Sequence, residues 1–91
     1  MSTPSRFVGI DVSKSRLDVA VRPTGEAWSV SNDEAGIARL LERLQEDPPG
    51  LVVVEATGRL EAPAVGVLAG AGIPLAVVNP RQVRAFARRP A

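Results

Sequence analysis

Hydrophobic and polar residues alternate along the first third of the chain. Between residues 7 and 12, Val8 and Ile10 fall on one side, while Gly9 and Asp11 fall on the other. The same alternation returns from residue 17 to residue 22 and, briefly, from residue 28 to residue 30. A period of two residues is typical of half-buried β-strands. Because short polar turns separate the three segments, the pattern predicts an antiparallel meander of three strands.

The next segment has the spacing of an amphipathic helix. Its apolar residues recur three and four positions apart, and they are Ile37, Leu40, Leu41 and Leu44. Ser31 and Asn32 are both suitable N-caps, and Ser31 with Glu34 has the spacing of a capping box. A Pro-Pro-Gly turn at residues 48–50 ends the segment. The pattern therefore predicts one helix after the meander, with a single buried stripe.

In the second half of the chain, the pattern of apolar and turn residues predicts strands and helices in alternation. Residues 51–55 form an unbroken apolar run that ends on an acid, which suits a strand buried on both faces. A mostly apolar helix is expected to open at residues 57–58 and to close at residues 70–72. Residues 73–78 predict a fifth strand, and the Asn-Pro pair at 79–80 predicts the start of a last helix.

This order of elements predicts an α/β fold. Three antiparallel strands followed by right-handed crossovers imply a mixed sheet of strand order 3-2-1-4-5 with helices on both faces. No internal repeat or low-complexity segment interrupts the pattern. We expect residues 1–5 to form a flexible polar leader and residues 6–91 to belong to one domain.

The absence of certain residue types from the sequence limits the kinds of catalysis and metal binding that the chain can support. The 91 residues include no cysteine and no histidine, which excludes disulfides, Ser-His-Asp and Cys-His catalysis, and the usual zinc sites. Carboxylates, hydroxyls, arginines and a single lysine, Lys14, remain. The longest apolar stretch, residues 62–78, is broken by prolines and glycines and is not a membrane span. Since no signal peptide starts the chain, we expect a cytoplasmic protein.

Two acids stand at the ends of otherwise apolar strands. Asp11 ends the first strand and Glu55 the fourth, and in the predicted sheet these parallel neighbours bring their carboxyl ends to one rim. A single acid at a strand end is more often a cap or a surface group, but an acid that ends an apolar run is costly without a role. A divalent metal ion relieves the repulsion between adjacent carboxylates, and Mg²⁺ prefers such oxygen ligands. Asp11 and Glu55 are therefore the candidate metal ligands and catalytic residues.

Charge is unevenly distributed along the chain. All ten acids lie within residues 1–61, where Asp18 and the acids of the first helix are interpreted as solvated. Residues 62–91 contain no acid and four arginines, which are Arg81, Arg84, Arg88 and Arg89. A helical stripe of arginines suits contact with a phosphate backbone, although a solvated helix face has the same pattern. Lys14, in the turn after the first strand, is a further candidate for phosphate contact, with a solvated turn as the alternative.

Several spaced blocks of sequence resemble one protein family. They are VGIDVSK at 8–14, LDVA at 17–20, NDEAGI at 32–37, VVEATG at 53–58 and VVNPRQVRAFA at 77–87. Together they resemble the DEDD insertion-sequence transposases, relatives of the Piv DNA invertase. The resemblance implies a ribonuclease H-like domain similar to that of the resolvase RuvC, in which four acids bind Mg²⁺. Asp11 matches the first of these acids and Glu55 the second.

The resemblance also carries expectations about the parent protein. Family members cut and join DNA, and an element-encoded guide RNA directs some of them. Their remaining two aspartates lie in a segment containing Lys-Thr-Asp beyond the Asn-Pro-Arg block, after Ala91. The chain is therefore expected to be the N-terminal part of the domain, incomplete at its C-terminus, inactive alone and weak in binding Mg²⁺. A sheet face left uncovered favours a homo-oligomer.

Three alternatives share parts of this pattern. An actin-like ATPase of the sugar-kinase type also opens with a strand hairpin and an aspartate. That class normally places glycine soon after its aspartate, where this chain has Val12, Ser13 and Lys14. A RuvC-like Holliday-junction resolvase has the same carboxylates and a different DNA substrate. A non-catalytic dimerisation module needs neither acid.

Overall fold

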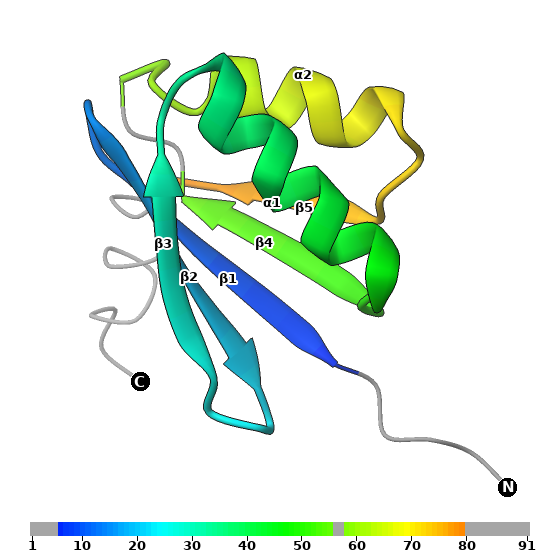
Figure 1. Cartoon of the computed structure of the whole chain (residues 1–91). Helices are drawn as coiled ribbons and strands as arrows, with labels where there is room; N and C mark the ends of the chain where they lie inside the picture. Colours follow the sequence, from blue (N-terminus) through cyan, green and yellow to red (C-terminus); the bar gives the residue numbers. More distant parts are fainter. Residues whose placement is uncertain (1–5, 56–57, 80–91) are drawn as a thin grey trace, which may run out of the picture.

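The computed structural model describes residues 6–55 and 58–79 as five strands and two helices. In chain order they are β1 (Phe7–Val12), β2 (Arg16–Arg22), β3 (Ala27–Ser31), α1 (Glu34–Glu46), β4 (Leu51–Glu55), α2 (Ala62–Gly70) and β5 (Leu75–Val78) (Figure 1). Each strand predicted from the sequence is present, with small shifts at its ends. The expected leader at residues 1–5 and the expected last helix from Pro80 onward lie outside the described residues.

The five strands form one mixed sheet in the order β3-β2-β1-β4-β5. β1 pairs antiparallel with β2, and β2 pairs antiparallel with β3. The pairs β1–β4 and β4–β5 are parallel. The predicted strand order is therefore confirmed, and β1 lies at the centre of the sheet.

The core lies between the sheet and the two helices. Alternate residues of β1, β2 and β4 are buried there, which explains the period of two in the sequence. α1 contributes the buried residues Ile37, Leu40 and Leu44, and α2 adds Ala64 and Leu68. Each large side chain buried in this way stabilises the fold by about 1.5–3 kcal/mol.

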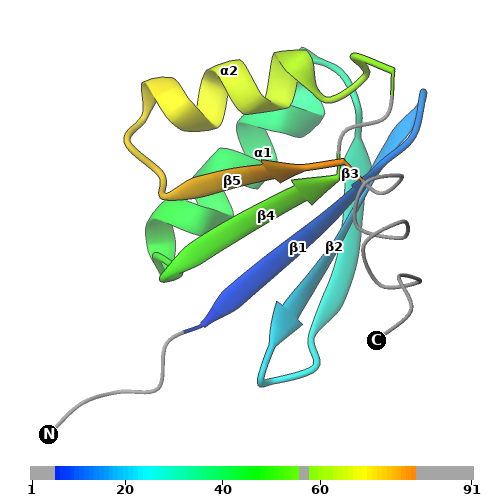
Figure 2. The same cartoon turned by 180° about the vertical axis from the view of Figure 1, so that it is seen from behind.

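Both described helices pack on the same face of the sheet. α1 crosses in front of β4 and β5 in Figure 1 and behind them in Figure 2, and α2 contacts α1 in the same core. Within residues 6–55 and 58–79, the expectation of helices on both faces is therefore met on one face only. The reason is that the crossovers from β3 to β4 and from β4 to β5 step in the same direction along the sheet. Right-handed crossovers that step in one direction place their helices on one face.

β4 has one covered and one open side in the described part of the chain. Val52 and Val54 are buried beneath the helices, whereas Leu51 and Val53 are only partly buried on the other side. The prediction of a strand buried on both faces is wrong for these residues. An unbroken apolar run indicates a buried strand but does not specify how many layers cover it.

The N-terminus of α1 is capped by Asp33. Its carboxylate accepts a hydrogen bond from the backbone N–H of Gly36 at 2.8 Å and another from the Ser31 hydroxyl at 2.8 Å. The sequence favours Ser31 or Asn32 as the cap, and both assignments are wrong. Asn32 is not available for capping because its side chain donates hydrogen bonds to loops at the rim of the sheet.

α2 begins at Ala62, later than the start expected at residues 57–58. Gly58 and Arg59 have φ values of 56° and 75°, and such left-handed residues do not belong to a right-handed helix. Pro63 then occupies the first turn of α2, where a missing N–H is tolerated. α2 is strongly apolar, but no helix in the part of the chain that the structure describes is long and apolar enough to cross a membrane.

Candidate functional site

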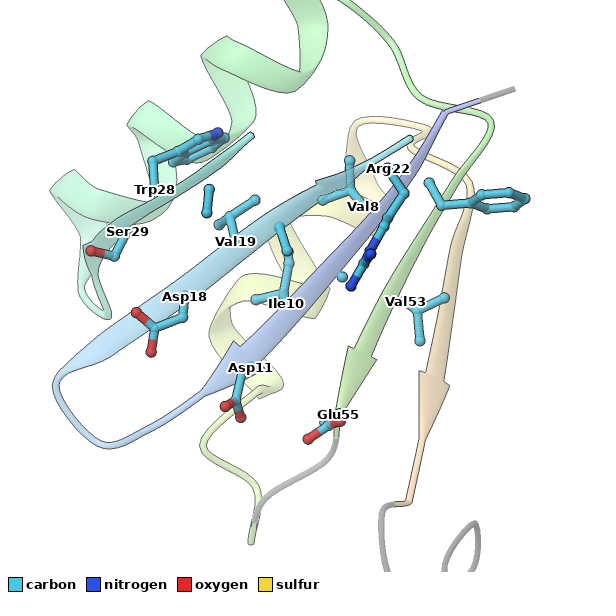
Figure 3. A pocket seen from close by; sticks show the side chains of 14 residues that line it. Val8, Ile10, Asp11, Asp18, Val19, Arg22, Trp28, Ser29, Val53 and Glu55 are labelled. Carbon is cyan, nitrogen blue, oxygen red and sulfur yellow. The ribbon is translucent and has the colours of Figure 1, made fainter. Parts of the chain in front are cut away.

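The structure brings Asp11 and Glu55 to one rim of the sheet. In the parallel pair β1–β4, Ile10 lies opposite Val54, so the next residue of each strand stands at the same level. Both acids are exposed, and Figure 3 shows their side chains projecting toward a common rim. The sequence-based prediction that the two strands are parallel neighbours with their acids at one rim is confirmed.

Packing of the core fixes this arrangement. Ile10 and Val54, one residue before each acid, are 2% and 0% exposed beneath the helices. Because side chains alternate along a strand, burial of these two residues turns their successors to the open face. A slip of one residue in either strand would move a carboxylate into the core, so the register is strongly specified.

A third carboxylate, Asp18, lies on the same face. In the antiparallel pair β1–β2 it stands directly opposite Asp11, and its Oδ1 atom is 3.0 Å from Arg16 Nε. Like charges directly opposite each other in a sheet repel, and the Arg16 guanidinium offsets that repulsion. On sequence alone Asp18 is interpreted as a solvated residue. The short turn between the first two strands is the signal that places it opposite Asp11.

The three carboxylates border an open depression of about 650 Å³ on the face of the sheet away from the helices (Figure 3). Small or apolar residues, among them Gly9, Ala20 and Val53, line much of the remainder. Among the described residues, no three His, Cys, Asp or Glu side chains form a group that could hold a metal ion. Asp11 and Glu55 therefore offer two adjacent carboxylates rather than a complete metal centre.

Of the candidate phosphate-binding residues, the structure describes Lys14 alone. Lys14 is exposed in the turn between β1 and β2, directly after the strand that carries Asp11. It consequently stands at the same rim as the acids. Arg81, Arg84 and Arg88 lie outside the described residues, so their contact with nucleic acid stays a prediction.

Asn32 is a rim residue whose role the sequence does not reveal. Its Nδ2 atom donates to the carbonyl of Ser13 at 2.9 Å and to the carbonyl of Leu60 at 3.3 Å. Its backbone N–H also donates to the carbonyl of Ser15 at 3.0 Å. On sequence alone Asn32 is interpreted as a helix cap, and its place in the NDEAGI block is the only sign of another role.

Comparison with solved structures relates the fold to RuvC. RuvC of Thermus thermophilus in complex with a Holliday junction substrate matches with a TM-score of 0.64 and 23% identity, over 90% of this chain and 69% of the RuvC chain. A second structure of Thermus thermophilus RuvC matches with a TM-score of 0.57 and 25% identity, over 87% of this chain and 64% of the other. The chain thus spans about two thirds of the length of these RuvC chains and has their ribonuclease H-like fold.

The family comparison is more specific. No curated protein sequence gives a significant match. A family model described as a transposase, that of the DEDD transposases of the IS110 type, matches residues 8–91. This match includes β1 with Asp11 and β4 with Glu55, so it covers both candidate acids. Because the match extends over nearly the whole chain, the protein belongs to the DEDD transposase family of the IS110 type.

Proposed function

We propose that this chain is part of the catalytic domain of a DNA transposase and that Asp11 and Glu55 are two of its metal ligands. The observation that carries the proposal is the parallel register of β1 and β4, at whose ends the two carboxylates stand at one rim. Family membership supports transposition as the activity, and the RuvC-like fold supports phosphodiester cleavage and strand transfer on DNA.

The donor set fits a hard divalent cation. Asp11 and Glu55 offer carboxylate oxygens, and the absence of cysteine and histidine from the sequence leaves no softer ligand to compete. Membership in a DEDD transposase family implies a divalent metal ion, and we propose Mg²⁺, which is commonly held by a few carboxylates together with water and phosphate oxygens. When bound, Mg²⁺ supplies positive charge that stabilises the phosphodiester group during cleavage.

The residues of the chain have separate tasks in this proposal. Asp11 and Glu55 hold the metal-binding oxygens, and Lys14 meets a DNA phosphate beside them. The candidates for sequence-independent contact with the DNA backbone are Arg81, Arg84 and Arg88. The further acids of the centre come from outside the described residues. Because both carboxylates stand at the ends of strands, the sheet sets their positions before DNA binds.

The proposal also covers the domain boundaries, the partners and the cellular location of the protein. We assign residues 6–91 to a single ribonuclease H-like domain, with residues 1–5 as a leader. Its nucleic-acid partner is DNA, and an element-encoded guide RNA is a further proposed partner. A second copy of the protein is also proposed, because transposition joins more than one DNA site. Since the substrate is cellular DNA, we place the protein in the cytoplasm.

The family match favours one of the DNA substrates considered. The RuvC structure was obtained with a Holliday junction, and a resolvase would use the same carboxylate pair. The model that matches residues 8–91 is that of a transposase family, which favours DNA cleavage and joining during transposition. Neither comparison favours an ATPase or a non-catalytic dimerisation module.

Removal of either carboxylate tests the proposal. Asp11→Asn and Glu55→Gln, each made in the full-length protein, keep the shape of the side chain and remove one ligand charge. We expect each variant to cleave DNA at least about a hundredfold more slowly in Mg²⁺, because residues that merely support metal ligands already contribute 10–100-fold. Cleavage and joining of a DNA substrate that carries the ends of the mobile element measure the effect, and DNA binding should be retained.

Glu42→Gln is the matched control. Glu42 lies exposed on α1, which covers the face of the sheet opposite to the two acids, and its substitution makes the same change in charge. Its cleavage rate should equal that of the unmodified protein. Wild-type cleavage by Asp11→Asn or by Glu55→Gln would refute the proposed metal site.

A further inference from the structure

Asn32 joins parts of the chain that are far apart in sequence. It is half-buried between β3 and α1. Its side chain bonds to the carbonyl of Ser13, 19 positions earlier, and to the carbonyl of Leu60, 28 positions later. Its backbone N–H bonds to Ser15 in the same β1–β2 turn as Ser13. One residue thus connects the turn after β1 with the turn before α2.

The chemistry of a carboxamide suits this connection. Both acceptors are backbone carbonyls, so only a group that carries hydrogen on nitrogen or oxygen fits between them. The Asn32 amide nitrogen has two hydrogens and satisfies both carbonyls at once. An ionised aspartate of the same size has no donor, and a serine has one. The two hydrogen bonds to backbone carbonyls therefore explain why an asparagine stands at position 32.

The two connected loops are those that follow the candidate metal ligands. Ser13 is the second residue after Asp11, and Leu60 is the fifth after Glu55. The register of β1 with β4 is defined only up to the residue before each acid. Beyond that point the strand ladder no longer holds the two segments together, and Asn32 supplies the connection at the same rim.

The residues after Asn32 fix the position of its backbone. Asp33 caps α1 through the N–H of Gly36. Gly36 also approaches Ser31 so closely that a Cβ atom on it would lie 1.8 Å from the Ser31 carbonyl oxygen. The start of α1 is therefore held against the end of β3, with Asn32 between them. These contacts account for the spacing Asn-Asp-x-x-Gly within the NDEAGI block.

We propose that Asn32 is a positioning residue for the Asp11–Glu55 pair. It fixes the separation of the two carboxylates by holding together the loops that follow them. This inference rests on the proposed metal-dependent function and deepens it. Residues that orient metal ligands typically change metal affinity or activity by about 10–100-fold when removed. A purely structural residue would change stability without this selective effect.

Asn32→Ala in the full-length protein tests the inference. We expect Mn²⁺, used as a spectroscopic substitute for Mg²⁺, to bind about tenfold more weakly, as measured without DNA from the electron paramagnetic resonance of the free ion. The Mg²⁺ concentration for half-maximal DNA cleavage should rise by a similar factor. Asn32→Ser provides a milder variant should the alanine variant not fold, since its shorter side chain has one donor and cannot bond to both carbonyls.

Val21→Ala is the matched control for stability, because Val21 is buried in the core and lies at the end of the β1–β2 pair that is remote from the rim. The substitution removes buried methyl groups but no hydrogen bond to either rim loop, so the thermal unfolding midpoint should fall while the Mn²⁺ affinity stays that of the unmodified protein. Unchanged Mn²⁺ affinity in a folded Asn32 variant would overturn the inference. An equal loss of affinity in Val21→Ala would also overturn it, because the effect would then follow from stability alone.

Asp11→Asn separates this inference from the proposed function. If Asp11→Asn loses Mn²⁺ while the Asn32 variants bind it normally, the metal site stands and the positioning role is wrong. If Asp11→Asn itself binds Mn²⁺ with unchanged affinity, the proposed site is wrong and the positioning role is wrong with it. Weaker binding in both Asp11→Asn and the Asn32 variants supports both.

Discussion

The Asp33 carboxylate is held in its charged form by two donors. The backbone N–H of Gly36 and the hydroxyl of Ser31 each donate to it at 2.8 Å, and these bonds hold the pKa of Asp33 below its ordinary value of 3.8. A carboxyl group whose pKa is lowered by folding stabilises the protein above its unfolded pKa. That contribution is lost as the pH falls through the lowered, folded value.

We therefore expect the effect of Asp33→Ala to depend on pH. The free energy of unfolding should be lower than that of the unmodified protein at neutral pH, and the difference should shrink as the pH falls below 3.8. Urea unfolding followed by circular dichroism, from neutral pH to about pH 2, measures the difference. Asp33→Asn keeps a comparable cap without a titrating charge, so its advantage over Asp33→Ala should not change with pH. A difference between the unmodified protein and Asp33→Ala that stays constant down to about pH 2 would argue against stabilisation by the charged form of the carboxylate.

Single residues differ in how far the sequence determines their roles. Ser31, Asn32 and Asp33 are all good N-caps by local preference, so local preference cannot select one of them. Two loop carbonyls that are distant in sequence accept hydrogen bonds from the side chain of Asn32, so this side chain does not cap the helix. Asp11 and Glu55 were predictable as a pair, because each ends an apolar strand and strand order alone brings them together.

At the level of elements, the contact between α1 and the end of β3 depends on a glycine. Gly36→Ala should destabilise the protein by about 1–3 kcal/mol, because the added Cβ would lie 1.8 Å from the backbone oxygen of Ser31 and the helix must shift. This cost outweighs the gain of about 1 kcal/mol that alanine ordinarily has over glycine within a helix. Urea unfolding at neutral pH measures the change.

Gly66→Ala in α2 is the matched control for that prediction. A Cβ atom added to Gly66 would meet nothing within 4 Å, so only the helix preference of alanine remains. This variant should be as stable as the unmodified protein or more stable, by up to about 1 kcal/mol. If Gly36→Ala were equally well tolerated, close contact between α1 and β3 would not be needed for the fold.

The elements themselves were predictable where the pattern of side chains is strong. The alternation in the first three strands and the stripe of α1 identify these elements because they reflect burial on one side only. The start of α2 was not predictable, since Gly58 and Arg59 adopt left-handed conformations that an apolar composition does not indicate. The unbroken run of β4 likewise indicates a buried strand without specifying how many helices cover it.

At the level of the whole molecule, strand order determines both the layers and the site. Both crossovers step toward β5, so both described helices lie on one face, and the acids at the ends of β1 and β4 face the other side. The depression beside them is consequently open in the part of the chain that the structure describes. The same topology that buries the core thus leaves the carboxylate rim accessible to a large substrate such as DNA.

Charge is distributed unevenly between the described residues and the end of the sequence. Residues 6–55 and 58–79 contain all ten acids and seven of the eleven bases, a net charge of −3, which repels a phosphate backbone. The other four bases are arginines that follow β5 in the sequence. Val78, the last residue of β5, lies opposite Glu55 in the parallel register. β5 therefore ends at the rim that carries the candidate metal ligands.

Replacing Arg81, Arg84 and Arg88 together by alanine should weaken DNA binding by the full-length protein to a similar extent for all DNA sequences. If each arginine binds one phosphate, the slope of log affinity against log salt concentration should become less steep by about 0.9 for each arginine replaced. Fluorescence anisotropy with two unrelated duplexes at several salt concentrations measures both effects.

Arg39→Ala is the control for this prediction, because Arg39 is an exposed arginine of α1 and its loss should leave the salt dependence unchanged. A loss confined to one duplex would mean that the arginines read bases, and an unchanged slope would mean that they do not meet phosphates. Asp11→Asn should show the opposite behaviour, with DNA binding retained and cleavage lost. DNA binding and DNA cleavage would then depend on different segments of the chain.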